Sequence, residues 1–275
     1  MKLELRETDS WDFLLNDKKP VAVYGMGDAA EKIIAVLNEK GIQVSEIFAS
    51  DDFVRGQSFL GKKVLTYREV CERLPDFNVV LGFATRLSDV IENIKKIASE
   101  HRVIAPDIPV AGGGLFTGKY FGEHKSEFER VYSLLADDES RRVYENVLRF
   151  KISGRIEYLL NCATQDKNVI YRDILKLGAH EKIIDAGAYD GDTIREFTAY
   201  TKGKYTHITA LEPDAKNFKK LTKNTAQMEN IRLINAAAWD KKDTLIFSAK
   251  AGRNSKLSAE GNTVEAIDMD SIIRQ

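Results

Sequence analysis

Short apolar runs alternate with amphipathic stretches along much of the chain. In the first half, apolar runs predict buried strands at residues 21–24, 44–49, 63–65, 79–83 and 103–104. Apolar positions at helical spacing predict one helix that ends near residue 40 and another at residues 87–99. Strands that alternate with helices are typical of a parallel sheet covered by helices. We therefore predict a Rossmann-like α/β domain over residues 1–115.

The second half repeats this pattern after a helical stretch. Residues 126–135, 137–150 and 156–160 predict helices, so we assign residues 116–165 to a helical connector and residues 166–275 to a second domain. In that domain the pattern predicts strands at residues 183–186, 208–211, 231–236, 244–248 and 263–267, and a helix at residues 193–200. The predicted fold class is α/β, with two Rossmann-like doubly wound domains joined by a helical segment.

Residues 183–192, the end of this strand and the loop after it, carry three acids, Asp185, Asp190 and Asp192. A pyrophosphate prefers bare backbone amides, whereas neighbouring carboxylates favour a ligand with a cationic centre or an ammonium group. S-adenosylmethionine has both. Gly187 and Gly191 stand four residues apart, unlike the G-x-G-x-x-G spacing of dinucleotide sites.

Glu212 follows the next apolar run, residues 208–211. In an open α/β sheet, ligands lie at the carboxyl ends of the strands, so this carboxylate can accept hydrogen bonds from both ribose hydroxyls. The two motifs therefore indicate one crevice.

These stretches resemble the FkbM-type S-adenosylmethionine-dependent methyltransferases. The resemblance covers roughly residues 137–275 and rests on Asp-Ala-Gly-Ala-Tyr-Asp-Gly-Asp-Thr (185–193), Leu-Glu-Pro-Asp (211–214) and residues 233–240 and 264–273. It implies a class I methyltransferase fold that uses S-adenosylmethionine, with methyl transfer to a hydroxyl of a sugar or another small metabolite. The cofactor-binding residues that it implies are Asp185, Gly187, Ala188, Tyr189, Gly191, Asp192, Glu212, Asn235 and Ala236.

The family continues with a strand that carries Lys-x-Asp-x-Glu-Gly, which this sequence does not reach. We therefore expect a truncated core. No spacing rule selects a catalytic base from Asp240, Asp268 and Asp270. Trp239 could stack on the adenine, although an aromatic residue here is more often part of the core. Arg253, Asn254 and Ser255 could contact a substrate or simply form an exposed connection.

The first half contains its own glycine motif, Gly25-x-Gly27-x-x-Ala30, with Asp51 or Asp52 where a ribose-binding acid would fall. The alternative function is therefore a non-catalytic protein that binds a nucleotide or nucleotide sugar there. An NAD-linked oxidoreductase is a further alternative, against which stands the lack of a Tyr-x-x-x-Lys or comparable acid-base set. An architectural turn explains the motif equally well.

Composition bears on the binding partners, on metal sites and on the location of the protein. The 42 acidic and 41 basic residues nearly cancel, so no global charge draws the chain to nucleic acid or to a membrane surface. Cys71 and Cys162 are far apart and the four histidines are scattered, so we predict no metal site. Without a signal-like or membrane-length apolar run, the predicted location is the cytoplasm. The predicted partner is a small-molecule or sugar acceptor, and homo-oligomerisation stays open.

Overall fold

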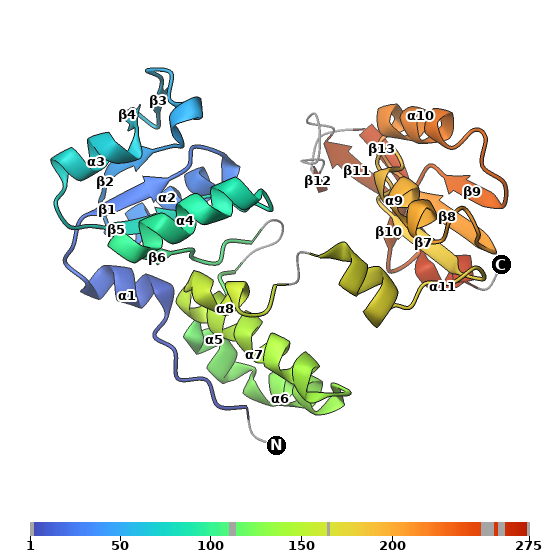
Figure 1. Ribbon diagram of the computed structural model, residues 1–275, viewed down its shortest axis with the longest axis horizontal. Helices are drawn as coiled ribbons and strands as arrows, with labels where there is room; N and C mark the ends of the chain where they lie inside the picture. The colour runs from blue at the N-terminus through green and yellow to red at the C-terminus, as the bar shows by residue number, and fades with distance from the viewer. Residues whose placement is uncertain (1–2, 110–113, 164–165, 249–255, 258–261, 274–275) are drawn as a thin grey trace. The chain divides into compact units, whose positions relative to one another are not determined.

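The computed structural model describes residues 3–109, 114–163, 166–248, 256–257 and 262–273. The chain divides into two compact units, Met1–Ala163 and Thr164–Gln275. Figure 1 shows their elements in chain order from blue to red. The helical segment that we expected as a connector belongs to the first unit as far as Ala163.

The first unit contains a six-stranded sheet with the order β3-β4-β2-β1-β5-β6. All neighbouring pairs are parallel except β3 and β4, which are antiparallel. The strands are β1 (Val21–Tyr24), β2 (Val44–Phe48), β3 (Ser58–Phe59), β4 (Lys62–Leu65), β5 (Asn78–Leu81) and β6 (Arg102–Ile104). A strand order that runs outward from β1 in both directions is that of a doubly wound sheet.

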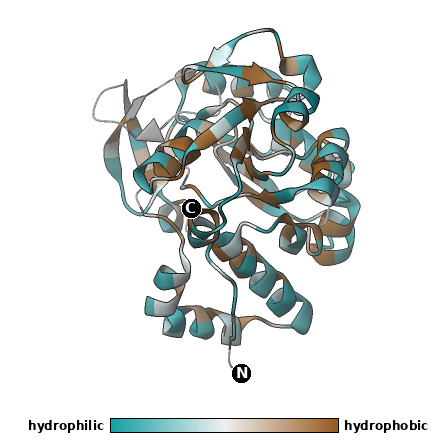
Figure 2. Cartoon of the chain, turned by 90° about the vertical axis from the view of Figure 1, so that its left-hand side faces the viewer, coloured by the Kyte–Doolittle hydropathy of each residue, from teal (hydrophilic) through white to brown (hydrophobic). Residues whose placement is uncertain are grey.

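Helices cover both faces of this sheet because the strands are apolar on both sides. Val21 and Val23 of β1 pack into a cluster with α1 (Ser10–Asn16) and α2 (Asp28–Glu39). Ala22 and Tyr24 face the opposite way, toward a cluster that includes α3 (Tyr67–Arg73) and α4 (Ser88–Glu100). Figure 2 shows brown apolar and teal polar stretches along single helices, as expected when a helix buries one side.

The remaining helices of the first unit form a layer beside the sheet. They are α5 (Gly118–Glu123), α6 (Lys125–Leu134), α7 (Asp138–Ser153) and α8 (Ile156–Leu160). Leu3, Phe121, Tyr132, Leu148 and Ile152 form their core. Asp137 caps α7 by accepting a hydrogen bond from the Ser140 N–H at 2.6 Å, as its sequence predicts. At the other end of α7, the Gly154 carbonyl accepts the Ala105 N–H at 2.7 Å, which joins this layer to the segment after β6.

In the second unit, β7 (Lys182–Ala186), β8 (His207–Leu211) and β9 (Ile231–Ile234) form a parallel sheet in that order. The helices α9 (Asp192–Tyr200) and α10 (Ala215–Asn224) connect them. Ile194 and Phe197 of α9 and Leu221 of α10 pack with Ile208 and Ala210 of β8. A π-helical segment, Val169–Ile174, precedes β7.

The strands after β9 do not extend this parallel sheet. They form a separate sheet with the order β10-β13-β11-β12, in which β11 is antiparallel to β12 and β13. Its elements, with the following helix, are β10 (Ala237–Trp239), β11 (Asp243–Ser248), β12 (Lys256–Leu257), β13 (Asn262–Asp268) and α11 (Met269–Ile273). Arg253, Asn254 and Ser255 lie outside the described residues. In the part of the chain that the structure describes, no helix is both long and apolar enough to cross a membrane.

Candidate functional site

The loop between β7 and α9 folds back against the end of β8. The backbone N–H groups of Gly187 and Ala188 both donate to the Leu211 carbonyl at 2.8 Å. Gly187 has a φ of +91°, a conformation that side chains disfavour, and a Cβ there would meet nothing within 4 Å. The backbone conformation therefore calls for glycine, and the space beside Gly187 is open.

The second glycine of the loop allows α9 to begin close to α10. Gly191 is the N-cap of α9 with a φ of +87°, and a Cβ there would lie 3.2 Å from Leu221 Cδ1. Its N–H donates to the Ala188 carbonyl at 2.7 Å. The two predicted glycines thus have different roles, one beside open space and one at a close packing contact.

Glu212, directly after β8, forms hydrogen bonds with three segments of the chain. It is only 6% exposed. Its Oε2 accepts the Tyr189 N–H at 2.8 Å and its Oε1 accepts the Asp214 N–H at 2.9 Å, while its own N–H donates to the Ile234 carbonyl at 3.1 Å. Burial raises the pKa of Glu212 above its ordinary value, and the two N–H donors offset part of that rise.

Asp185, near the end of β7, completes an acidic cluster with Asp192 and Glu212. Burial raises the pKa of Asp185, and the neighbouring charges of Asp192 and Glu212 raise it further. Its Oδ2 is buried and has no hydrogen-bond partner among the described residues. Asp190 differs, because Arg195 pairs with its Oδ1 at 3.3 Å. The structure therefore brings two of the three loop acids together with Glu212.

The residues expected at the adenine lie at the end of β9. Asn235 Nδ2 donates to the Glu212 carbonyl at 2.7 Å and to the Pro213 carbonyl at 3.2 Å, and Ala236 is fully buried. Asn235 thus fixes the backbone on either side of the Glu212–Pro213 bond. The Tyr189 ring, in the loop, has the Lys220 ammonium 5.6 Å from its centroid. Adenine contacts by Asn235 and Ala236 stay a prediction.

Sequence reasoning did not find a cavity in the separate sheet. Ala238, Trp239, Asp240 and Met269 line an open space of about 360 Å³, and Trp239 is 39% exposed. Asp268 caps α11 by accepting the Ser271 N–H at 2.7 Å, which places Asp270 in the first turn of that helix. Of the three acids that the sequence left undecided, Asp240 is the one that lines this cavity.

The glycine motif of the first unit lies between β1 and α2. Gly25 has a φ of +121°, and a Cβ there would lie 2.9 Å from the Phe83 ring. A Cβ on Gly82 would lie 2.7 Å from the Cβ of Ala30, which is fully buried. Close packing therefore accounts for Gly25 and Ala30.

The other two residues of that motif are more open. Gly27 is the N-cap of α2 with nothing within 4 Å of its would-be Cβ. Asp51 is exposed in the short turn Asp51–Phe53 after β2. Nucleotide binding by these residues stays a prediction. Within the described ranges, no group of three His, Cys, Asp or Glu side chains is arranged to hold a metal ion.

Comparison with known proteins supports the fold. No family model matches the sequence, and no curated protein matches it. Among solved structures, the chain is similar to the crystal structure of methyltransferase FkbM from Methylobacillus flagellatus KT, with a TM-score of 0.60 and 16% sequence identity. The match covers 93% of this chain and 70% of that one. At this identity the similarity shows that the chain has an α/β fold like that of a methyltransferase.

Proposed function

We propose that the second unit binds S-adenosylmethionine and that the protein is a methyltransferase. The observation that carries the proposal is the buried, unpartnered Oδ2 of Asp185, which lies in an acidic cluster beside the open space at Gly187. A buried carboxylate oxygen without a donor is costly unless a ligand supplies one. The cationic and ammonium groups of S-adenosylmethionine suit this cluster.

The residues present fit the parts of this cofactor. Asp185 and Asp192 would face its ammonium group, and the Gly187 backbone would leave room for its chain. Each Glu212 oxygen accepts one N–H in the structure, and a carboxylate oxygen has a second lone pair with which to accept a ribose hydroxyl. Asn235 and Ala236 would lie on the adenine side, as the family resemblance implies.

The acceptor in this proposal is a hydroxyl of a sugar or another small metabolite. When bound, S-adenosylmethionine supplies a sulfonium-activated methyl group, so the protein's main task is to orient the acceptor oxygen. The resemblance of residues 137–275 to FkbM-type enzymes and the structural similarity to a methyltransferase support this assignment. We assign no catalytic base.

Calorimetric titration of the full chain with a ligand panel tests the proposal. S-adenosylhomocysteine should bind saturably, and Asp185→Ala or Glu212→Ala should abolish the heat, with hydrogen exchange verifying that the second unit of each variant stays folded. NAD and a nucleotide sugar serve as controls for the alternative functions of the Gly25-x-Gly27 turn. If the folded chain binds either of these and not S-adenosylhomocysteine, the proposal is wrong.

A further inference from the structure

A cavity of about 350 Å³ in the first unit is lined by three arginines, Arg6, Arg102 and Arg155. Among the described residues that line it, Glu7 is the only acid. The three cations come from the N-terminal segment, from β6 and from the turn between α7 and α8. Residues that lie far apart in sequence thus bring like charges to one cavity, an arrangement that a bound anion would stabilise.

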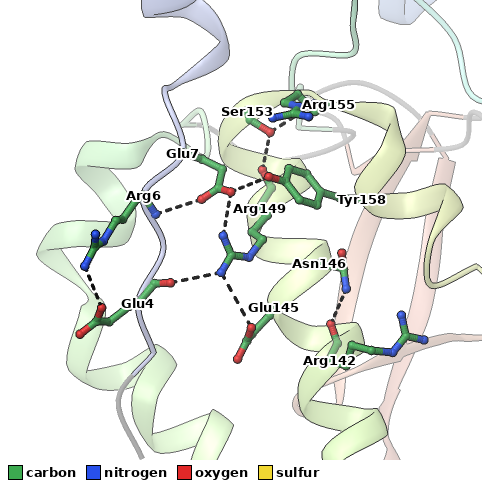
Figure 3. Close-up of polar contacts among 10 residues, drawn as sticks. All are labelled: Glu4, Arg6, Glu7, Arg142, Glu145, Asn146, Arg149, Ser153, Arg155 and Tyr158. Carbon is green, nitrogen blue, oxygen red and sulfur yellow. Dashed lines mark hydrogen bonds and ion pairs between the residues drawn. The ribbon is translucent and has the colours of Figure 1, made fainter. Parts of the chain in front are cut away.

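Glu7 does not neutralise the three cavity arginines, because its carboxylate already pairs with Arg149. Figure 3 shows Glu7 pointing toward Arg149 and Tyr158. Glu7 Oε1 accepts hydrogen bonds from Arg149 Nη1 at 2.7 Å and from the Tyr158 hydroxyl at 2.6 Å. Burial alone would raise the pKa of Glu7, but the hydrogen bonds from Tyr158 and Arg149 hold it below its ordinary value. Glu7 is therefore an ionised partner of Arg149.

The cavity arginines are accessible to a ligand. Arg102 stacks over the Phe13 ring at 5.7 Å, and no ion pair to Arg102 is formed within the part of the chain that the structure describes. Arg155 lies 3.5 Å from Glu157, and the Arg6 side chain, 88% exposed, is turned toward Glu4 at 3.2 Å (Figure 3). Exposed pairs of this kind contribute little to stability, so both arginines can exchange their partner for a ligand.

The wall of the cavity is rigidly built. Gly154 has a φ of +66°, and a Cβ there would lie 2.8 Å from Ile104 Cγ2, so only glycine allows this close approach. The Gly154 carbonyl accepts the Ala105 N–H at 2.7 Å. The turn that carries Arg155 is thereby held against the end of β6, the strand that begins with Arg102. The backbone that carries Arg102 and Arg155 is therefore in place before a ligand binds, which lowers the entropy cost of binding.

The cavity and the glycine motif lie at opposite ends of the parallel strands. Arg102 pairs with Asn78, the first residue of β5, and Asn78 pairs with Val21, the first residue of β1. Arg102 therefore lies at the amino ends of these parallel strands. The Gly25-x-Gly27 turn follows Tyr24, at the carboxyl end of β1.

We propose that this cavity binds a phosphate monoester of a small organic molecule. The planar guanidinium fork matches phosphate oxygens with paired hydrogen bonds, and two or more such groups suit a dianion. The volume is near the lower end of the roughly 300–1,000 Å³ range of small-molecule sites, which excludes a dinucleotide. Phe13 and Ile104, which also line the cavity, would contact the organic part.

Calorimetric titration of the full chain with inorganic phosphate, glycerol 3-phosphate and phenyl phosphate tests this site, with glycerol and phenol as uncharged controls. The two esters should bind saturably, more tightly than inorganic phosphate and more weakly as salt is added. Arg102→Gln and Arg155→Gln should each weaken binding at least about fivefold. The matched control is Arg68→Gln, because Arg68 pairs with Glu72 on α3 and does not line the cavity; it should change the affinity less than about twofold. Circular dichroism verifies that each variant is folded.

Three results would overturn the assignment. The folded wild-type chain could bind no phosphate compound below about 10 mM, a range that covers weak charge-assisted binding. The esters could bind equally well to both cavity variants and to Arg68→Gln, which would place the site elsewhere. Glycerol or phenol could bind as well as the corresponding ester, which would remove the role of the phosphate. None of these results depends on S-adenosylmethionine.

Discussion

The carboxylate of Glu212 accepts the backbone N–H of Tyr189 at 2.8 Å and that of Asp214 at 2.9 Å. One buried side chain thereby joins the loop after β7 to the loop after β8. The glycine loop and the predicted ribose-binding acid are therefore parts of one hydrogen-bonded structure, and the same residue that would bind a cofactor also shapes the loop that would hold it.

Replacing Glu212 should reveal this structural role without any ligand. Glu212→Ala removes the acceptors of two backbone N–H groups and should destabilise the second unit by about 2–4 kcal/mol. Glu212→Gln keeps one acceptor oxygen and the volume, so its cost should be less than half of that. Hydrogen exchange of the β8 amides measures both values. Equal stability of wild type and Glu212→Ala would show that these two hydrogen bonds contribute nothing net.

Asp185→Asn should stabilise the unliganded second unit at neutral pH. The pKa of Asp185 is raised, so ionised Asp185 is less favourable in the folded state than in the unfolded state. The protonated Asp185 carboxyl stabilises the folded second unit fully below its ordinary pKa. This stabilisation is lost as pH rises through the raised pKa of the folded state. We expect a gain in the free energy of unfolding at pH 7.5 and none near pH 3.5.

The matched control for this comparison is Asp190→Asn. Asp190 lies in the loop that follows Asp185 but pairs with Arg195, so neutralising it should give no gain at either pH. Hydrogen exchange of β7 and β8 at the two pH values measures both variants. An Asp185→Asn variant that is less stable than wild type at neutral pH would contradict the raised pKa.

Affinity for S-adenosylhomocysteine should depend on pH through the same carboxylates. Its ammonium group needs ionised Asp185, and its ribose hydroxyls donate best to an ionised Glu212. Both pKa values are raised above the ordinary values of 3.8 and 4.5. Affinity should therefore begin to fall above pH 4.5 as the solution is acidified from neutral, and bound ligand should lower both pKa values. Titration between pH 4.5 and 8 measures this. An affinity that is flat down to pH 4.5, or that rises on acidification, would exclude the charge interaction.

Gly154→Ala should strongly destabilise the first unit. The added Cβ would lie 2.8 Å from Ile104 Cγ2 and 3.0 Å from the Ala105 oxygen, in a left-handed conformation. Gly56→Ala is the matched control, since Gly56 has a φ of +76° with nothing within 4 Å. We expect about 1 kcal/mol for Gly56→Ala and at least about 3 kcal/mol for Gly154→Ala. Urea unfolding measured by Trp11 fluorescence, in a Trp239→Phe background, gives both values. Similar costs for the two variants would show that the close contact is harmless.

The sequence predicts the parts of this fold whose signals are local. Gly187 and Gly191 indicate the loop because the left-handed backbone there needs glycine, and the apolar runs before Asp185 and Glu212 indicate their strands. Two seven-residue helices, α1 and α3, were missed because a segment of two turns is too short to show a clear helical period. Thr66 and Glu69 form a capping box at the start of α3, and this spacing could have revealed that helix.

Local sequence signals do not predict contacts between segments that lie far apart in the chain. Nothing near Glu212 in the sequence indicates that Tyr189 donates to it, because the contact depends on how two loops meet. The sequence also treats Asp185 and Asp190 alike, whereas in the structure Arg195 pairs with Asp190 alone. The arginine cavity has the same origin, since its walls come together only when β6 and the end of α7 pack.

The dissociation constant of S-adenosylhomocysteine for wild type, Asp185→Asn and Asp190→Asn at pH 7.5 tests the central claim most directly. These two variants remove the same charge five residues apart, at the end of β7 and in the loop after it, so a difference between them isolates the unpartnered carboxylate of Asp185. We predict saturable binding by wild type, weakening of at least about tenfold in Asp185→Asn and of less than about threefold in Asp190→Asn. No binding by the folded wild-type chain, or equal affinity in both variants, would contradict an S-adenosylmethionine site at this acidic cluster.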